Sequence, residues 1–475
     1  MAFTILNIAS RSLAAEQLAM EVTGNNMANA TTPGYRRETA NLVESPPIPD
    51  PSLGDTLQGQ GVRVDAITRA QNAFLSRSVR LQYGTAGYWN SLNTVLSQIQ
   101  NVFQEPSSSG LAEAMNQFFN SWLTLSQTPD SLPARQAVLE QGKSLTGVFH
   151  MMSQQLSQAM GNINTSLINS VNKMNTLSAQ IAQLNGQIAG VSSSGGTANT
   201  LLDQRGLLMD QLSQLANISY TVNSDQTVNI YLGSNPLVVN QQASSLHVEP
   251  GSAPTSGSSN IPPIDQIDFS SSPAQTATRL RGLANGSLKG LLVAGSDLSQ
   301  YLTNLNQLAQ TMISRVNALQ TQGYQLGSAS SGNNFFSGTS ASSIAVSLNT
   351  PQAIAAASGP QQTGNGEIAL QIAQLVHSPI PFAASSSANS QAYTFNQYYT
   401  NLVGQVGNDG QQAQSRYNSA NATLQSLRNA RQSATGVDIN QSSAHLIQEQ
   451  QSYQAAASLI SVEQTLMANL LQAVG

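Results

Sequence analysis

The chain has 475 residues, enough for two to four domains, and a mild net charge of −5. Only 9% of the residues are charged, about a third of the usual share, whereas 40% are apolar. The apolar share supplies a sizeable core and argues against wholesale disorder. The few lysines and arginines form no patch along the sequence, so a nucleic-acid partner is not expected.

The chain contains no cysteine, which excludes disulfides and thiolate metal sites. No apolar run approaches the roughly 20 residues that a membrane span needs. The first residues lack the basic segment and the long apolar segment of a secretory signal peptide. We therefore expect no membrane partner, and we expect any export to use a route without a cleaved signal.

Residues 4–30 are predicted to form a helix with an apolar residue at every seventh position. An interfacial membrane helix is an alternative, but such a helix favours Lys and Arg on its polar face. Here Arg11 stands alone against Glu16 and Glu21. The residues of the heptad stripe are Leu6, Leu13, Met20 and Met27.

Residues 24–38 span the end of this helix and contain three asparagines and a Pro-Gly pair. Pro33 fixes its own φ and disfavours helical angles at Thr32, and Gly34 can adopt a positive φ. The segment therefore predicts a helix end and a tight turn into extended chain. The simplest interpretation is a helix C-terminus with Asn-rich capping. The asparagines are Asn25, Asn26 and Asn29.

Residues 25–37, Asn-Asn-Met-Ala-Asn-Ala-Thr-Thr-Pro-Gly-Tyr-Arg-Arg, resemble the N-terminal signature of the bacterial flagellar axial proteins, which comprise rod, hook and hook-associated proteins. Within that family the Pro33–Arg37 segment is most similar to the hook-associated protein 1 group. The resemblance implies that this region packs subunits together, through the stripe and asparagines above and through Pro33, Gly34 and Tyr35.

Residues 35–82 are predicted to be extended and irregular, and residues 84–215 to be almost entirely helical. The helix over 131–190 has the strongest pattern, a coiled-coil heptad through Leu167, Met174, Ile181 and Ile188. The Leu-Asp-Gln-Arg segment at 202–205 resembles another segment of hook-associated protein 1. Gly206 departs from that pattern, because the family usually has an acid there.

Residues 216–283 change to strand alternation, which predicts a β-hairpin in a small β-rich domain. Helices are predicted over 296–322 and 393–431. Between them, residues 324–390 are rich in Ser, Gly and Asn, and we expect a second small insertion or a loose extension.

A last helix is predicted over 439–473 as the counterpart of the first, and residues 436–471 resemble the C-terminal signature of the axial family. Asn440-Gln441-Ser442 replaces acids that are common in relatives. The predicted packing residues are Ile439, Leu446, Tyr453, Ile460, Met467, Leu470 and Leu471.

These patterns predict a mainly α fold with a β-rich insertion. We expect a long, coiled-coil-like antiparallel helical bundle built from both termini, with small outer β domains. The expected domains are an inner assembly domain of 1–83 with 432–475, a helical bundle of 84–217 with 284–325 and 391–431, a β-rich insertion at 218–283, and a second insertion or extension at 326–390.

The sequence shows no catalytic pattern, and we expect neither an enzyme nor a cofactor or metal site. Four histidines are scattered, and phosphate-binding glycine loops and a nucleophile elbow are missing. Asp203 and Asp210 lie seven apart and can share a helix face, where carboxylates are usually structural. A secreted hydrolase with its site in 216–283 or 325–390 is the alternative from another class.

The resemblance implies a structural subunit at the junction between flagellar hook and filament. The partners that it implies are other copies of the chain in a helical ring, the hook protein, a second hook-associated junction protein, and an export chaperone that covers the C-terminal helix. It also implies export through the flagellar type III apparatus to an extracellular position. A distal rod or hook subunit is the alternative within the family.

Overall fold

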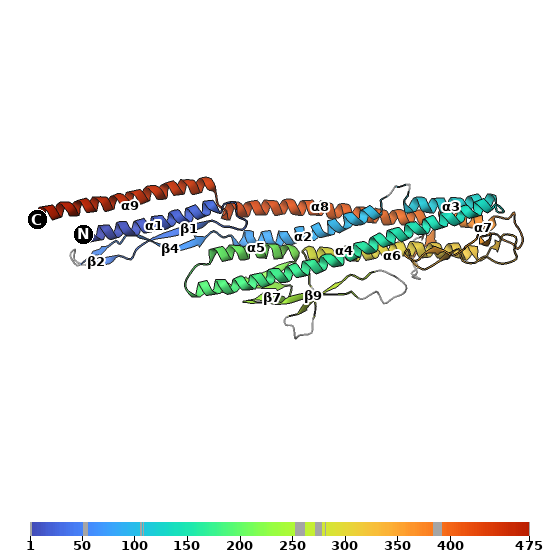
Figure 1. Cartoon of the computed structure of the whole chain (residues 1–475), viewed down its shortest axis with the longest axis horizontal. Helices are drawn as coiled ribbons and strands as arrows, with labels where there is room; N and C mark the ends of the chain where they lie inside the picture. Colours follow the sequence, from blue (N-terminus) through green and yellow to red (C-terminus); the bar gives the residue numbers. More distant parts are fainter. Residues whose placement is uncertain are drawn as a thin grey trace.

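A computed structural model of the chain describes residues 2–50, 56–104, 107, 109–251, 262–270, 278–280, 282–382 and 392–474. The molecule is a long rod with both termini at one end (Figure 1). The helices are α1 (Ala2–Ala28), α2 (Ala73–Val102), α3 (Leu111–Gln127), α4 (Leu132–Ser193), α5 (Asn199–Leu215), α6 (Ser287–Gln320), α7 (Glu367–Gln374), α8 (Phe395–Thr435) and α9 (Ile439–Val474), with 3-10 turns at Pro351–Ala353 and Leu375–His377.

The strands form small antiparallel sheets rather than one continuous sheet. The pairs are β1 (Glu38–Glu44) with β4 (Val62–Arg69), β2 (Ile48–Asp50) with β3 (Thr56–Gln58), β12 (Tyr324–Gln325) with β15 (Ala355–Ala357), β13 (Phe336–Ser337) with β14 (Ala345–Val346), and β16 (Ile380–Pro381) with β17 (Ala392–Tyr393). Two larger sheets have the order β5-β6-β7-β8 and β11-β10-β9, from β5 (Ile218–Val222), β6 (Val228–Leu232), β7 (Asn235–Val239), β8 (Gln242–Ala243), β9 (Ser245–Glu249), β10 (Gln266–Ser270) and β11 (Thr278–Arg279).

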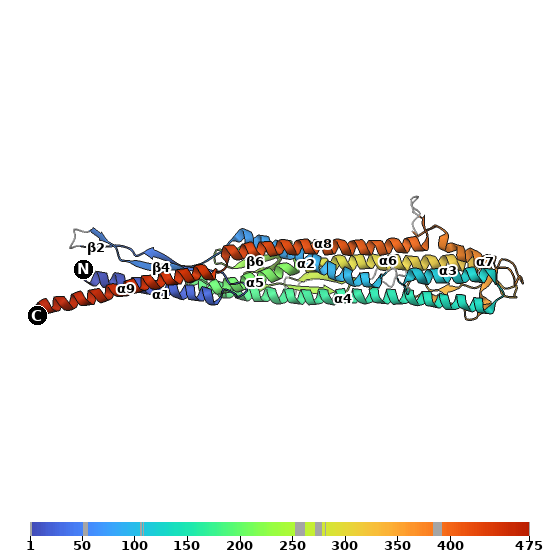
Figure 2. The same ribbon diagram turned by 90° about the horizontal axis from the view of Figure 1, so that it is seen from above.

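At the end with the termini, α1 and α9 run antiparallel beside the β1–β4 ribbon, and we call these elements the arm (Figures 1 and 2). Beyond the arm, helices α2 to α6 and α8 form the bundle. One apolar cluster runs through the bundle and includes Leu96, Phe118, Leu167 and Leu305, each almost fully buried. The buried residues of α1 are outside this cluster, so the arm has its own packing.

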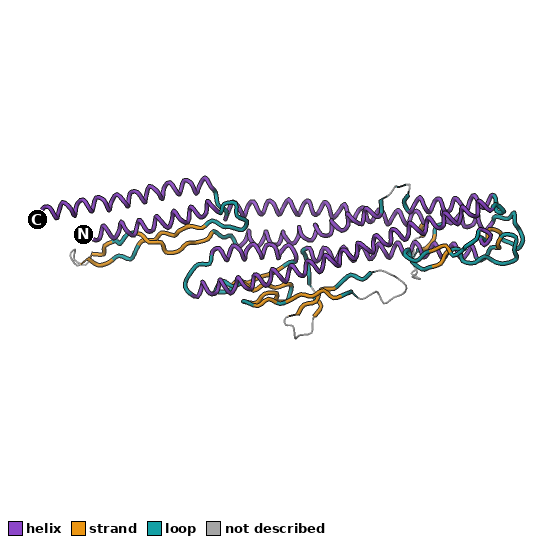
Figure 3. The backbone as a smooth tube through the Cα atoms, viewed as in Figure 1, coloured by secondary structure: helices purple, strands orange, loops and turns teal. Residues whose placement is uncertain are grey.

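Helix α4, with 62 residues, spans the bundle, and the larger sheets lie along one side of it (Figure 3). Ser131 caps its first turn by accepting a hydrogen bond from the Ala134 N–H. Three asparagines of α4 then hold the β-rich region by its backbone. For example, Asn175 donates to Leu246 O and accepts from Leu246 N, each at 2.9 Å. Asn164 and Asn185 bind backbone groups of the β-rich region in the same two-sided way.

The far end of the rod is closed by residues of the 326–390 segment, which pack into the main apolar cluster. Phe335 and Phe336 have no exposed surface and lie against Phe118. Arg135, 1% exposed, donates to Pro129 O at 2.7 Å and to Ile354 O at 2.6 Å. Of the two alternatives for this segment, these contacts match a packed insertion rather than a loose extension.

The predicted fold class is confirmed, and most helix ends lie within a few residues of their predicted positions. Two helices begin earlier than predicted: α2 at residue 73 instead of 84, and α6 at residue 287 instead of 296. Asn72 starts α2 because its side chain accepts a hydrogen bond from the Leu75 N–H. The prediction of extended chain over residues 73–82 was therefore wrong.

Candidate functional site

The arm brings the two predicted packing helices together, and most of their fully buried side chains are small. The buried apolar residues of α1 are Ala9, Ala15, Ala19 and Val22. On α9 the buried positions are Ser442, Ala456 and Glu463, which follow a seven-residue spacing. The contact between α1 and α9 within one chain therefore buries few large apolar side chains, and we call it the seam.

The predicted stripe residues lie at the edges of this seam. Leu6 is 38% exposed and Ile439 is 53% exposed. The others are partly buried: Leu13, Met20, Met27, Leu446, Tyr453, Ile460 and Met467. The side chains of Leu470 and Leu471 lie outside the described residues. Other apolar residues are exposed on α9: Leu459 and Leu466, which broaden the predicted stripe, and Ile447 and Val462, which the predicted pattern does not include.

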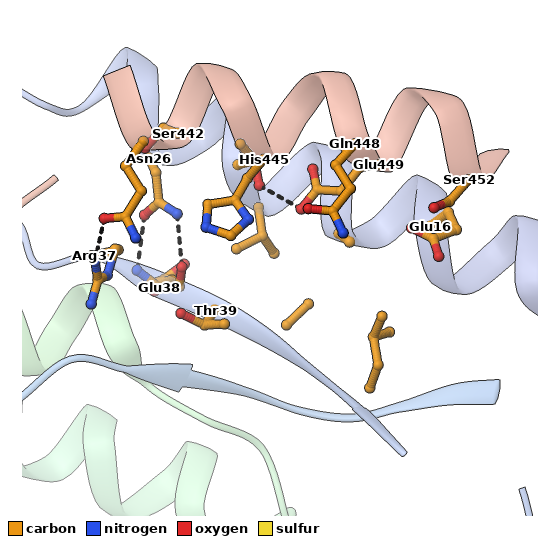
Figure 4. Close-up of a pocket in the computed structure, with 16 residues that line it drawn as sticks. Glu16, Asn26, Arg37, Glu38, Thr39, Ser442, His445, Gln448, Glu449 and Ser452 are labelled. Atoms are coloured by element: carbon orange, nitrogen blue, oxygen red, sulfur yellow. Dashed lines mark hydrogen bonds between the residues drawn. The ribbon is translucent and has the colours of Figure 1, made fainter. Parts of the chain in front are cut away.

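The asparagines after the first stripe fix strand β1 to α1. Asn26 is buried, donates to Glu38 O at 2.7 Å and accepts from Glu38 N at 2.8 Å (Figure 4). Tyr35 donates from its hydroxyl to the same Asn26 Oδ1 at 3.0 Å, and Asn25 donates to that hydroxyl at 3.3 Å. Asn29 donates back to Asn25 O at 3.1 Å. The asparagines therefore set the angle between helix and strand as well as capping the helix.

The Pro-Gly turn lies against α5. Gly34 has a φ of +86°, and a Cβ there would lie 3.3 Å from Leu207 Cβ. Two residues later, the Arg36 N–H donates to Asp203 Oδ2 at 2.9 Å. The Arg37 N–H donates to Thr435 O at 2.9 Å, at the end of α8. The segment from Pro33 to Arg37 therefore joins the arm to the bundle, and we call this region the joint.

Two buried aspartates on α5 bind arginines from other segments. Asp203 accepts from Arg69 Nε, and its carboxylate lies 4.0 Å from Arg36 Nε. Asp210 accepts from Arg80 Nε at 2.9 Å and from Arg431 Nη1 at 2.7 Å. Asp203 thus ties α5 to β4 and to the Pro-Gly turn, and Asp210 ties α5 to α2 and α8. No local sequence pattern pairs these aspartates with such distant arginines.

Burial shifts the pKa values of the charged groups at the joint. It raises the pKa of Asp203, and the charges of Arg69 and Arg36 lower that pKa only part of the way back. Burial, followed by the neighbouring charges of Arg69 and Arg431, lowers the pKa of Arg36 to about 10. Because desolvation opposes the attraction, these pairs add little net stability, although removing one partner would leave the other charge buried and unpaired.

A groove of about 440 Å³ lies between α1, β1 and α9 (Figure 4). Thr23 donates to Glu449 Oε1 at 2.9 Å, and Oε2 of the same carboxylate is buried without a hydrogen-bond partner. Burial, followed by the charge of Glu449, raises the pKa of Glu16. His445 also lines the groove, as does Ser442. The groove is part of the seam between α1 and α9.

The described residues contain no group of three acidic, histidine or cysteine side chains placed to hold a metal. His150 lies in α4, His247 in β9, His377 after α7 and His445 in α9. No helix in the described part of the chain combines the length and apolar character of a membrane span.

Comparison with known proteins places this arrangement in a family. Residues 96–336 match the family described as the flagellar hook-associated protein FlgK helical domain, and residues 6–36 match the family of flagella basal body rod proteins. The chain belongs to the FlgK family of flagellar hook-associated proteins. It is therefore a structural component of the flagellum. The rod-protein match is confined to the first helix and its turn, so it gives no support to the rod alternative.

Individual relatives agree with this membership. The chain is 27% identical to flagellar hook-associated protein 1 of Bacillus subtilis, across all of this chain and 98% of that protein. It is 30% identical to the protein of the same name from Salmonella typhimurium, across 70% of this chain and 59% of that protein. The solved structure of the flagellar hook junction protein FlgK from Burkholderia pseudomallei superposes on 75% of this chain with a TM-score of 0.67 at 17% identity, which supports the fold.

Proposed function

We propose that this chain is a structural subunit of the junction between flagellar hook and filament, and that it assembles through the arm. The observation that carries the proposal is the apolar surface that a single arm leaves exposed on α9. Five of its side chains are about half exposed, and we call them the α9 stripe: Ile439, Ile447, Leu459, Val462 and Leu466 at 53%, 57%, 49%, 55% and 51%. Leu459, Val462 and Leu466 share one face of the helix, whereas Ile439 and Ile447 lie on other sides of it.

The occupant proposed for the α9 stripe is the arm of a neighbouring copy. Completing the burial of five half-exposed side chains is worth roughly 5 kcal/mol before the entropic cost of association. Helix α9 carries no Lys or Arg and only Glu449 and Glu463 as acids, so repulsion between copies is weak. Contacts between different faces of α1 and α9 are heterologous, so they repeat from one copy to the next along a helical path, and one turn of that path is the helical ring proposed for the junction.

The finer assignments are part of the proposal. The inner domain, predicted as residues 1–83 with 432–475, corresponds to the arm, although residues 73–83 lie in α2 and residues 432–435 in α8 of the bundle. Its packing residues are the predicted stripe, the asparagines and the Pro-Gly turn. The hook protein and a second hook-associated protein are the axial partners. An export chaperone covers α9 before the chain leaves through the flagellar type III apparatus, because the exposed α9 stripe would otherwise cause early assembly in the cytoplasm.

The role requires no chemistry. Asp203 and Asp210, the carboxylates that share a helix face, are each bound by arginines and are poor candidates for proton transfer.

Electron microscopy of a strain that lacks this chain tests the proposal. The expected result is intact hooks without filaments, with unassembled flagellin outside the cell. Flagella that end at the rod would indicate the distal-rod alternative instead and would overturn the junction assignment.

A further inference from the structure

The joint contains more arginines than acids. Five described arginines bind Asp203 or Asp210 or line the cavity beside the joint, and Arg37 of the joint itself is a sixth. Arg80 and Arg205 are 9% and 6% exposed. Arg205 has no carboxylate in its hydrogen bonds: it donates to Asn185 Oδ1 at 3.0 Å and to Gln226 O at 2.6 Å. The five arginines are Arg36, Arg69, Arg80, Arg205 and Arg431.

The positive charges of neighbouring arginines destabilise one another when the side chains are removed from water. Burial, followed by the charges of Arg69 and Arg80, lowers the pKa of Arg205 to about 10. Asp225 also attracts Arg205, but its carboxylate accepts hydrogen bonds from the N–H and hydroxyl of Thr227. The joint is therefore left with a positive field that its own acids do not balance.

A cavity of about 170 Å³ lies among these arginines, between the end of β4, α2, α5 and the β5–β6 hairpin. Arg36, Arg69, Arg80 and Arg205 line it. Gly206 forms part of its wall. A Cβ built on Gly206 would lie 3.9 Å from Arg80 Nη2 and 4.0 Å from Arg69 Nη2. Two guanidinium ends thus approach one point of the cavity, and the residue at that point contributes no side chain.

We propose that this cavity binds a small oxyanion of the phosphate, sulfate or carboxylate class between Arg69 and Arg80. Guanidinium groups present planar donors that match the oxygens of such anions, and the volume accommodates an ion of that size. The bound anion balances the excess charge where the arm meets the bundle, and so it stabilises the angle between them.

Inorganic phosphate is the probe. The melting temperature of the purified chain is measured against low-millimolar phosphate, with chloride adjusted to keep ionic strength constant. A ligand at ten times its dissociation constant raises the folding equilibrium constant about elevenfold. We expect a saturable rise of roughly 2 °C. Phosphorus-31 line broadening of phosphate, with the same saturation, gives a second readout that needs no variant. A melting temperature that does not change, with no broadening, overturns the proposal.

Two matched variants test the location. Gly206→Asp places a carboxylate beside both guanidinium ends, and Gly206→Asn places a neutral side chain of the same shape there. We expect the Asp variant to melt above the Asn variant in chloride and to lose the response to phosphate. Gly161→Asp, on an open face of α4 with no atom within 4 Å of its Cβ, should keep the response. A phosphate response that persists unchanged in Gly206→Asp overturns the proposal.

Discussion

Gly34→Ala tests whether the Pro-Gly turn sets the position of the arm. With φ at +86°, an alanine costs about 1–2 kcal/mol in backbone strain. Its methyl group would also lie 3.3 Å from Leu207 Cβ, which adds about 1 kcal/mol unless the turn moves away from α5. Movement of the turn would lengthen the hydrogen bond from the Arg36 N–H to Asp203.

Gly195→Ala is the matched control. Gly195 has a φ of +78° and no atom within 4 Å of a built Cβ, so the substitution carries the backbone strain alone. Denaturant unfolding of both variants, with hydrogen exchange of β1 and β4, measures the difference. We expect Gly34→Ala to lose about 1 kcal/mol more, to exchange faster in the β1–β4 ribbon and to assemble poorly. Equal losses in the two variants, with normal assembly of Gly34→Ala, would refute the role of this turn.

Three further predictions concern the arm. Ile460→Asp should block incorporation into the junction while the bundle melts normally, because α9 has no Lys or Arg to pair with the new charge; complementation and calorimetry check this. Limited proteolysis of the free chain should trim residues before about 35 and after about 438 first, because the arm lies outside the main core; ends as resistant as α4 would contradict this. The pKa of Glu16 is raised in the folded chain, so its ionisation destabilises the fold as pH rises through that pKa. Glu16→Gln should therefore slow hydrogen exchange in α1 at pH 7 and lose this advantage below pH 4.5, the ordinary pKa, where Glu16 is protonated in both states. An advantage that does not change with pH would count against the repulsion from Glu449.

Long apolar repeats made most of the helices predictable. The heptad through Leu167 and Ile181 places α4 correctly because those side chains face one continuous core. The start of α2 lacks such a repeat, since its buried positions include small residues. Ser76 and Arg80 are buried there through polar contacts instead: Ser76 Oγ accepts from Arg36 Nη2 at 3.2 Å, and Arg80 Nε donates to Asp210 Oδ1 at 2.9 Å. A sequence pattern of large apolar residues cannot reveal that kind of contact.

The candidate assembly site was predictable only where its residues are close together in the sequence. The Asn-rich turn was recognisable because its residues are neighbours in the chain. The joint was not, because Asp210 binds an arginine 221 positions away, and no local pattern specifies that partner. The α9 stripe was predicted in part: Ile439 belongs to the predicted heptad and Leu459 and Leu466 broaden it, whereas Ile447 and Val462 lie outside the predicted pattern. Heptad residues of α9 such as Leu446 and Ile460 are partly buried, while Leu459 and Val462 are about half exposed.

The central claim is that the α9 stripe packs against a neighbouring copy, and a paired charge substitution tests it most directly. Leu459→Asp with Val462→Asp is compared with Leu123→Asp with Met151→Asp, which changes two residues of the bundle that are 42% and 48% exposed. Both proteins are expressed in a strain without this chain, and export, melting and filaments are measured. The account predicts equal export and equal melting, with filaments on the hooks only in the bundle variant. Normal filaments in the α9 variant would contradict it.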